Sequence, residues 1–233
     1  MPRNVMVFVE DELNDAYEIL VRKAMGLPLD INSGVRIRVV RVTQDELMDY
    51  NNLLDLSQRA LRSGAQQVVF CMDHEGPGAD PGRVQARRQF REAFQQLCDY
   101  IDGLPQSHSL KRIHLARVEV HSCLEAWLLS DPPAIARAAG DHSYMPSARQ
   151  THQLPPHQAR QNIAHILNEV GRRRSKRHLR RISASAVRSW GHRIAREMDI
   201  VNARRYNFSL NYFCAMIETN RNGCEQTFPD PPE

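Results

Sequence analysis

Four short apolar runs mark the first half of this chain, at residues 4–9, 35–42, 67–72 and 112–120. Runs of this length that are rich in valine, isoleucine and phenylalanine are typical of strands buried in a sheet. In the second run the apolar residues alternate with Arg36 and Arg38. That alternation indicates a strand with one covered face or a position at the edge of the sheet.

The stretches between these runs carry apolar residues at helical spacing. Between residues 11 and 25, for example, Leu13, Tyr17, Leu20 and Ala24 fall on one face. Helices are expected at residues 11–25, 44–64, 83–101 and 122–130. Strands that alternate with helices predict an α/β fold with a mostly parallel sheet flanked by helices.

The pattern changes after Asp131, where Pro132 and Pro133 are expected to stop the preceding helix. Histidine, proline and arginine become frequent, and the periodicity predicts helices without strands. These helices are expected at residues 156–170, 175–198 and 203–218, followed by a frayed tail at 224–233. The chain is therefore divided into an α/β domain, residues 1–131, and a helical, basic C-terminal region, residues 132–233.

The distribution of charge supports this division. Residues 1–131 contain 15 Lys or Arg and 19 Asp or Glu, a net charge of −4, whereas residues 132–233 contain 16 and 8, a net charge of +8. The first part has the carboxylates that a metal site requires. The second part has the charge that suits an anionic partner.

Acidic residues stand where two of the predicted strands end. Glu10 follows the first run, and Asp73 and Glu75 follow the third. The carboxyl ends of neighbouring parallel strands meet at one edge of a sheet, where ligands bind in open α/β folds. Mg²⁺ favours one or two carboxylates together with water and phosphate oxygens. These residues therefore predict an Mg²⁺ (or Mn²⁺) site, unless they form an acidic loop edge that caps neighbouring helices.

Glu10, with the Asp73-His-Glu75 pair after a later strand, resembles the Toprim fold of topoisomerases, primases, OLD-type nucleases and RloB-like proteins. The stretch Val118-Glu-Val-His-Ser-Cys-Leu-Glu-Ala-Trp-Leu-Leu-Ser-Asp131 resembles a signature of an uncharacterised bacterial Toprim-like family. Residues 202–213 resemble the C-terminal motif of the same family. This chain departs from the family at Asp11, where glycine is usual, and at Glu75, where aspartate is usual.

The resemblance implies a metal-dependent nuclease that cleaves DNA or RNA. Glu10, Asp73 and Glu75 would be its metal ligands, and Glu125 would be a further catalytic carboxylate. Members of the family are often encoded beside AAA- or ABC-type ATPases. The resemblance thus implies an effector of anti-phage defence that works with an ATPase partner.

Other polar residues near these motifs leave alternatives open. His121 and Glu125 are four residues apart and are expected to share a face of the helix at 122–130, where His121 is either an acid/base group or a solvent-exposed side chain. His74 either contacts a phosphate or faces the other side of the sheet. Trp127 is expected in the core, and Asp131 is expected at a helix end.

A run of basic residues near the C-terminus predicts a nucleic-acid backbone contact. On a helix, Arg173, Arg177 and Arg181 would form one stripe. The predicted contact residues are Arg172, Arg173, Arg174, Lys176, Arg177, Arg180 and Arg181. The alternative is a solvated helix or a contact with an acidic partner subunit.

Several classes are excluded by what the sequence lacks. It has no apolar run long enough for a membrane span, no secretory leader pattern, no P-loop and no zinc-binding spacing. A cytoplasmic protein with reduced cysteines is expected, and a homo-oligomer is compatible with the sequence. Two other functions stay open: a catalytically silent Toprim-like module that binds nucleic acid or an ATPase subunit, and a different phosphotransfer enzyme.

Overall fold

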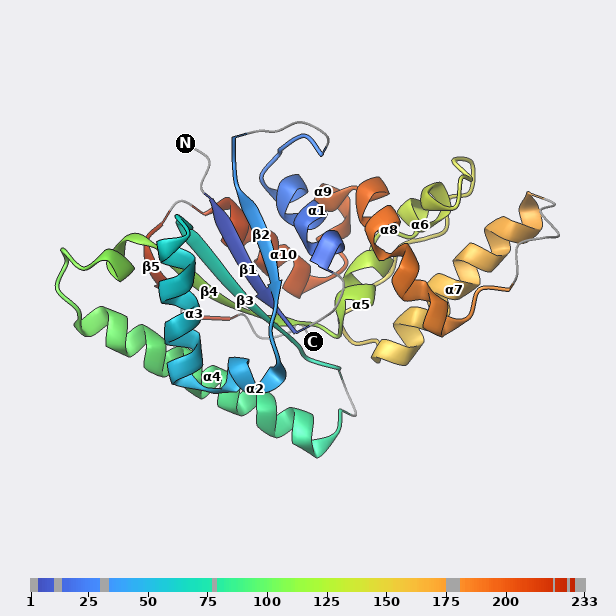
Figure 1. The fold of residues 1–233 in the computed structure, drawn as a ribbon. Helices are drawn as coiled ribbons and strands as arrows, with labels where there is room; N and C mark the ends of the chain where they lie inside the picture. Colours follow the sequence, from blue (N-terminus) through green and yellow to red (C-terminus); the bar gives the residue numbers. More distant parts are fainter. Residues whose placement is uncertain are drawn as a thin grey trace.

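A five-stranded sheet with the order β2-β1-β3-β4-β5 forms the centre of the computed structural model, and every neighbouring pair is parallel (Figure 1). The structure describes residues 4–10, 14–29, 34–76, 79–174, 181–219, 221–225 and 227–228. The strands are β1 (Val5–Val9), β2 (Ile37–Arg41), β3 (Gln67–Asp73), β4 (His114–Val120) and β5 (Gly223–Glu225). The predicted α/β class, with a parallel sheet flanked by helices, is confirmed.

The burial of each strand follows from its place in this order. β1, β3 and β4 lie inside the sheet and are almost wholly buried, which explains their continuous apolar sequence. β2 lies at an edge, and its residues are half-buried or exposed. The edge position that the alternation at Arg36 and Arg38 indicated is therefore confirmed.

Helices cover both faces of the sheet. They are α1 (Asn14–Ala24), α2 (Gln44–Met48), α3 (Tyr50–Arg62), α4 (Pro81–Gly103), α5 (Leu124–Leu129), α6 (Pro132–Ala138), α7 (Pro156–Arg173), α8 (Gly191–Glu197), α9 (Ile200–Ala203) and α10 (Phe208–Glu218), with 3₁₀ turns η1 (Ser109–Arg112) and η2 (Ala184–Trp190).

Two hydrophobic clusters lie on opposite faces of the sheet. On the face covered by α3 and α4, Phe70 stacks on Phe8 and meets Phe94 edge-on. On the other face α1 and α10 are packed, with α5 to α8 beyond them, and Tyr17 contacts Trp127 and Phe213. This second cluster contains residues from both sides of residue 131, so the core is continuous across the predicted domain boundary.

One predicted helix is divided in two. Thr43 caps α2 through a capping box with Glu46. The helix predicted over 44–64 nevertheless breaks at Asp49, whose extended backbone ends α2. The Asp49 side chain then caps α3 by accepting a hydrogen bond from the Asn52 N–H. The hydrogen bond from the Asn52 N–H to the Asp49 side chain thus replaces the backbone hydrogen bonds of a continuous helix.

The C-terminal region departs further from its prediction. β5 adds a strand to the edge of β4 where only helices and a frayed tail were expected. A segment of three residues is too short to show the alternation of apolar and polar residues that predicts a strand. Its conformation comes from the pairing with β4. Pro132 and Pro133 stop α5, as predicted, but they also begin α6, because proline fits the first turn of a helix.

The predicted helices at 203–218 and 175–198 are also wrong in extent. Asn207 separates α9 from α10. Residues 175–180 lie outside the described part of the chain, and α8 begins only at Gly191, after the η2 turn. All five cysteines are free thiols, four of them buried. Within the described ranges, no helix combines the length and apolarity needed to cross a bilayer.

Candidate functional site

The carboxyl ends of β1 and β3 bring Glu10 and Asp73 to the same edge of the sheet. The strands pair in parallel, with Val9 opposite Cys71, and the Glu10 N–H donates to the Cys71 carbonyl at 3.3 Å. The neighbouring position of the two strands is the condition on which the predicted convergence depended, and it is met.

Arg83, in the first turns of α4, joins two of the predicted metal ligands. Its guanidinium donates to Glu10 Oε1, and its Nε lies 3.1 Å from Glu75 Oε1. One side chain therefore supplies a positive charge to both carboxylates at the place where a cation was expected.

Glu75 takes an unusual backbone conformation to reach this position. Its φ is +58°, in the left-handed region that non-glycine residues rarely adopt. Its N–H donates to the Ser122 carbonyl at 2.7 Å. Gly76 follows with φ +72°, and a Cβ there would lie 3.1 Å from the Ser122 Cβ. Strained residues of this kind concentrate at functional sites.

Asp73 lies on the other side of the sheet edge. Because side chains alternate along a strand, Asp73 shares the face of Cys71, which belongs to the α1 side of the core, whereas Phe70 and Met72 face α4. Burial together with the charge of Asp73 raises the pKa of Cys71. Glu10, Asp73 and Glu75 thus surround the edge without forming a compact group within 4.8 Å among the described residues.

Glu10 is the carboxylate of this set that is best suited to a divalent cation. The Glu10 Oε2 atom is buried and has no hydrogen-bond donor within the described part of the chain. An acceptor left in this state suits a cation or its water. The carboxylates come from two rigid strand ends, which is the type of donor set that Mg²⁺ and Mn²⁺ accept.

A second cluster, His74, Glu119 and His121, lies beside this edge. Ligand atoms of the three residues all lie within 4.8 Å of one another. The imidazoles are stacked, with ring centroids 3.6 Å apart and planes inclined by 20°. Burial, and then the charge of Arg87, lowers the pKa of His74 to about 4. Burial, and then His74, lowers the pKa of His121 to about 2, so both rings are neutral at pH 7.

Glu119 is held by two arginines although its side chain is only 1% exposed. Arg91 donates to both of its oxygens, at 2.7 and 2.5 Å, and Arg117 donates to Oε1. Burial by itself would raise the pKa of Glu119, but these hydrogen bonds and charges hold it below the ordinary value. Glu119 is therefore an ionised carboxylate with its charge already compensated.

The geometry of this second cluster does not favour a cation. The lone pairs of imidazole lie in the ring plane, so those of two stacked rings run nearly parallel and do not converge on one ion. Arg91 and Arg117 also outweigh the single charge of Glu119, and Arg87 adds another positive charge nearby. The residue types suggest a metal, but the charge around them suits an anion.

His121 does not share a helical face with Glu125, contrary to the prediction. α5 begins at Leu124 after Cys123 as N-cap, and His121 lies in the turn before it. The His121 N–H donates to Ser209 Oγ at 2.9 Å, and its carbonyl accepts from Asn207 Nδ2 at 2.7 Å. These contacts from α10 hold the turn in place where the local pattern favoured a helix.

Glu125 lies on the α7 side of the site. Its side chain is 1% exposed, and Arg160 donates to its Oε1 at 2.9 Å, while its Oε2 is buried without a donor within the described ranges. Burial, followed by the charges of Glu125 and Asp73, raises the pKa of Cys123. The thiol therefore stays neutral, and the two carboxylates approach it from the same side of the sheet.

The family-like motifs have structural roles that the structure makes plain. Trp127 is fully buried, as predicted, and its indole N–H donates to Ser209 Oγ at 2.8 Å. Asp131 stands at a helix end, as predicted, and caps α6. Asn207 caps α10. The motifs at 118–131 and 202–213 therefore meet each other.

The C-terminal basic run is arranged differently from its prediction. Arg172 pairs with Glu169 at 3.1 Å, Arg173 pairs with Asp141 at 3.2 Å, and Arg174 donates to the Ala139 carbonyl. α7 ends at Arg173, so Arg181, which has no helical conformation, does not continue its stripe. Lys176, Arg177 and Arg180 lie outside the described residues.

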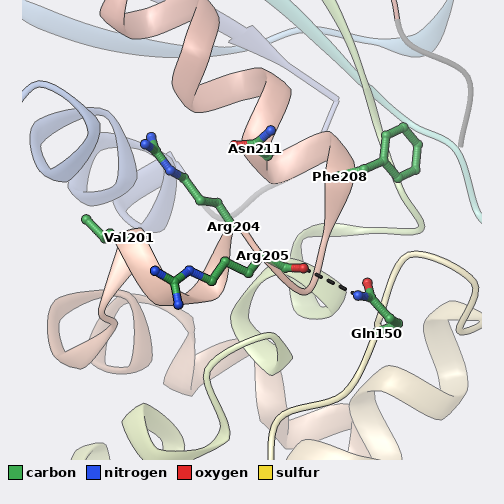
Figure 2. Close-up of a pocket in the computed structure, with 6 residues that line it drawn as sticks. All are labelled: Gln150, Val201, Arg204, Arg205, Phe208 and Asn211. Carbon is green, nitrogen blue, oxygen red and sulfur yellow. Dashed lines mark hydrogen bonds between the residues drawn. The ribbon is translucent and has the colours of Figure 1, made fainter. Parts of the chain in front are cut away.

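A separate pocket of about 430 Å³ lies beside α9 and α10 (Figure 2). Its lining residues are Gln150, Val201, Arg204, Arg205, Phe208 and Asn211. The side chains of Arg204 and Arg205 extend toward Val201, whereas the Phe208 ring extends the opposite way, and Gln150 donates to the Arg205 carbonyl at 3.3 Å (Figure 2). The lining contains no carboxylate, histidine or cysteine, so it has no group for metal or acid–base chemistry.

Sequence reasoning missed the arginines of α4 and Glu119. Arg83, Arg87 and Arg91 recur at every fourth residue, a spacing that places them on one helical stripe. That spacing was visible in the sequence. Glu119 was hidden inside an apolar strand, where a buried carboxylate requires a partner that only the fold identifies.

Comparisons with protein-family models, with curated proteins and with solved structures find no match to this chain.

Proposed function

We propose that the protein is a metal-dependent phosphodiesterase that cleaves nucleic acid at the carboxyl edge of its sheet. The observation that carries this proposal is the placing of Glu10 and Asp73 at the ends of adjacent parallel strands, with Glu75 joined to Glu10 through Arg83 and a buried unpaired oxygen on Glu10. Mg²⁺ or Mn²⁺, when bound by these carboxylates, would polarise a phosphoryl oxygen and lower the pKa of a water molecule.

The residues of the chain itself would organise the reaction. Arg83 would balance the carboxylates and lie within reach of a phosphate. The buried strands β1 and β3 would fix Glu10 and Asp73 with little freedom to move. Glu125 and Asp73 both lie near Cys123, so Glu125 would add a second negative charge close to Asp73.

The biological setting is part of the same proposal. The resemblance to Toprim-like proteins that are encoded beside AAA- or ABC-type ATPases points to an effector nuclease of anti-phage defence with an ATPase partner. The chemistry of the site is independent of that setting and can be tested on the purified chain.

The test is to incubate the full chain with supercoiled plasmid, single-stranded DNA and tRNA in Mg²⁺, Mn²⁺ or EDTA. We expect cleavage that EDTA abolishes and that Asp73→Asn and Glu10→Gln reduce about 100-fold or more. Glu92→Gln is the matched control, because Glu92 lies on the exposed side of α4 and pairs with Arg88. Cleavage that persists in Asp73→Asn would contradict the proposal.

One observation favours a second function, that of a catalytically silent module. Arg83 already supplies a positive charge to both Glu10 and Glu75, so the edge is stable without a metal. A silent module would bind nucleic acid equally well in EDTA and in Mg²⁺, and it would cleave none of the three substrates in either metal.

A further inference from the structure

The α4 helix begins beside the carboxyl ends of the strands and runs along the sheet, which places its first turns against the candidate site (Figure 1). Arg83, Arg87 and Arg91 lie on the stripe of α4 that faces this edge. Each makes a contact there: Arg83 with Glu10 and Glu75, Arg87 with the His74 carbonyl, and Arg91 with Glu119. Successive members are about 6 Å apart along the helix axis.

These guanidinium groups remain accessible. The side chains of Arg83 and Arg91 are 31% and 53% exposed, and Arg87 is half-buried. Within the described ranges no carboxylate pairs with Arg87, which contacts only an uncharged carbonyl. A guanidinium has five donors in a planar fork that matches phosphate, so most of the donor capacity of Arg87 is available to a ligand.

The two carboxylates near Arg87, Glu119 and Glu75, already have arginine partners of their own. Glu119 pairs with both Arg91 and Arg117, and Glu75 pairs with Arg83, so neither carboxylate is left to neutralise Arg87. The His74 Nδ1 atom is buried and has no hydrogen-bond partner in the described part of the chain. A guanidinium with unused donors beside a polar atom without a partner suits an anion.

We propose that Arg83, Arg87 and Arg91, the α4 arginine stripe, bind the phosphodiester backbone of the substrate. This assignment rests on the proposed function for the identity of the ligand. It moves the principal phosphate contact from the C-terminal basic run to α4, where the arginines adjoin the carboxylates.

Arg87 and its neighbour Arg88 provide a matched pair of variants. Arg88 carries the same charge on the same helix, but it points to solvent and pairs with Glu92 at 3.0 Å. Arg87→Ala and Arg88→Ala therefore change the net charge equally. The first removes the charge from the face of α4 that contacts the site, and the second removes it from the face that points to solvent. Arg87→Lys keeps the charge and loses the planar fork.

The experiment measures binding of fluorescent single-stranded DNA, duplex DNA and tRNA by the full chain in EDTA, over a series of salt concentrations. We expect Arg87→Ala to weaken binding about tenfold and to reduce the slope of log K against log salt by about one. Arg88→Ala should bind as the wild type does, and Arg87→Lys should recover part of the affinity. Thermal unfolding of each variant verifies the fold.

Three results would contradict the proposal that the α4 arginine stripe binds nucleic acid. They are equal binding by the Arg87→Ala and Arg88→Ala proteins, a wild-type chain that binds none of the three nucleic acids, and a loss of binding in Arg172→Glu with Arg87→Ala unaffected. If the stripe binds as expected but no metal supports cleavage, the proposed catalysis fails while the stripe stands. The two proposals therefore fail separately.

Discussion

At the residue scale, Arg83 determines how the carboxylates at the sheet edge are held. Glu10 and Glu75 come from different strand ends, and both contact its guanidinium. Two carboxylates at one site repel each other unless a positive charge lies between them. Arg83 supplies that charge, and a bound cation would compete with it.

Removal of Arg83 should therefore strengthen cation binding. We expect Arg83→Gln to bind Mn²⁺ about tenfold more tightly than the wild type, because a competing charge a few ångströms from the ion is lost. Isothermal titration calorimetry without nucleic acid measures this directly, with Arg88→Gln as the control for net charge. An Arg83→Gln affinity equal to or below that of the wild type would show that Arg83 and the cation do not compete.

His121 is another residue whose state is decided by its surroundings. It stacks on His74, meets Phe208 edge-on at 4.6 Å, and faces Phe228 and His152. Burial is the main reason that its pKa falls to about 2 from the ordinary 6.5. The folded chain therefore keeps this imidazole neutral over the whole range in which a free histidine would gain a proton.

This shift gives stability a definite dependence on pH. As the pH falls below about 6.5, the unfolded chain binds a proton at His121 and the folded chain does not, so stability is complete above that pH and decreases below it. Urea unfolding between about pH 7.5 and pH 5 measures the loss. His121→Gln should show a shallower decrease, with the remainder due to His74, whose pKa is also lowered. Identical pH profiles of the wild type and His121→Gln would contradict this explanation.

At the scale of elements, the N-terminus of α10 fixes the turn between β4 and α5. Asn207 Oδ1 accepts hydrogen bonds from the N–H groups of Ser209 and Leu210 at 3.1 and 3.2 Å. Its Nδ2 donates to the His121 carbonyl and to Thr151 Oγ1. A helix cap is thus also the link that shapes the candidate site.

Loss of this cap should be costly because it leaves buried groups without partners. We expect Asn207→Ala to reduce the free energy of unfolding by about 2–4 kcal/mol. Asp199→Ala removes the more accessible cap of α9 and should cost about 1 kcal/mol. Urea unfolding of both variants compares them, and equal losses would mean that the link to His121 contributes little.

At the scale of the whole molecule, the division at residue 131 does not coincide with a break in packing. Tyr17 and Trp127 belong to the first part, yet they pack against Phe213 of the second. α1 packs against both α8 and α10. One face of the sheet is therefore covered largely by helices that follow residue 131.

A fragment of residues 1–131 should consequently fail to fold by itself. It would expose the apolar face that α8 and α10 cover, including the surroundings of Trp127. Circular dichroism and urea titration should reveal no cooperative transition for the fragment, in contrast to the full chain. A sharp transition in the fragment would establish residues 1–131 as an independent domain.

The sequence by itself determined the parallel α/β class and the placing of Glu10 and Asp73 at strand ends, and it limited β2 to an edge position or to a strand with one covered face. These features follow from burial patterns within a few residues, because the period of apolar positions depends on local geometry. The Thr43 cap and the buried Trp127 were predictable for the same reason.

Only the tertiary structure decided the rest. β5 owes its conformation to the edge of β4, the turn at His121 is held by Asn207 and Ser209, and Arg83 reaches Glu10 across 73 positions of the chain. Each depends on segments that meet only after the sheet has formed. Contacts between distant segments are specified by packing in three dimensions, and a local pattern of apolar and polar residues contains no record of them.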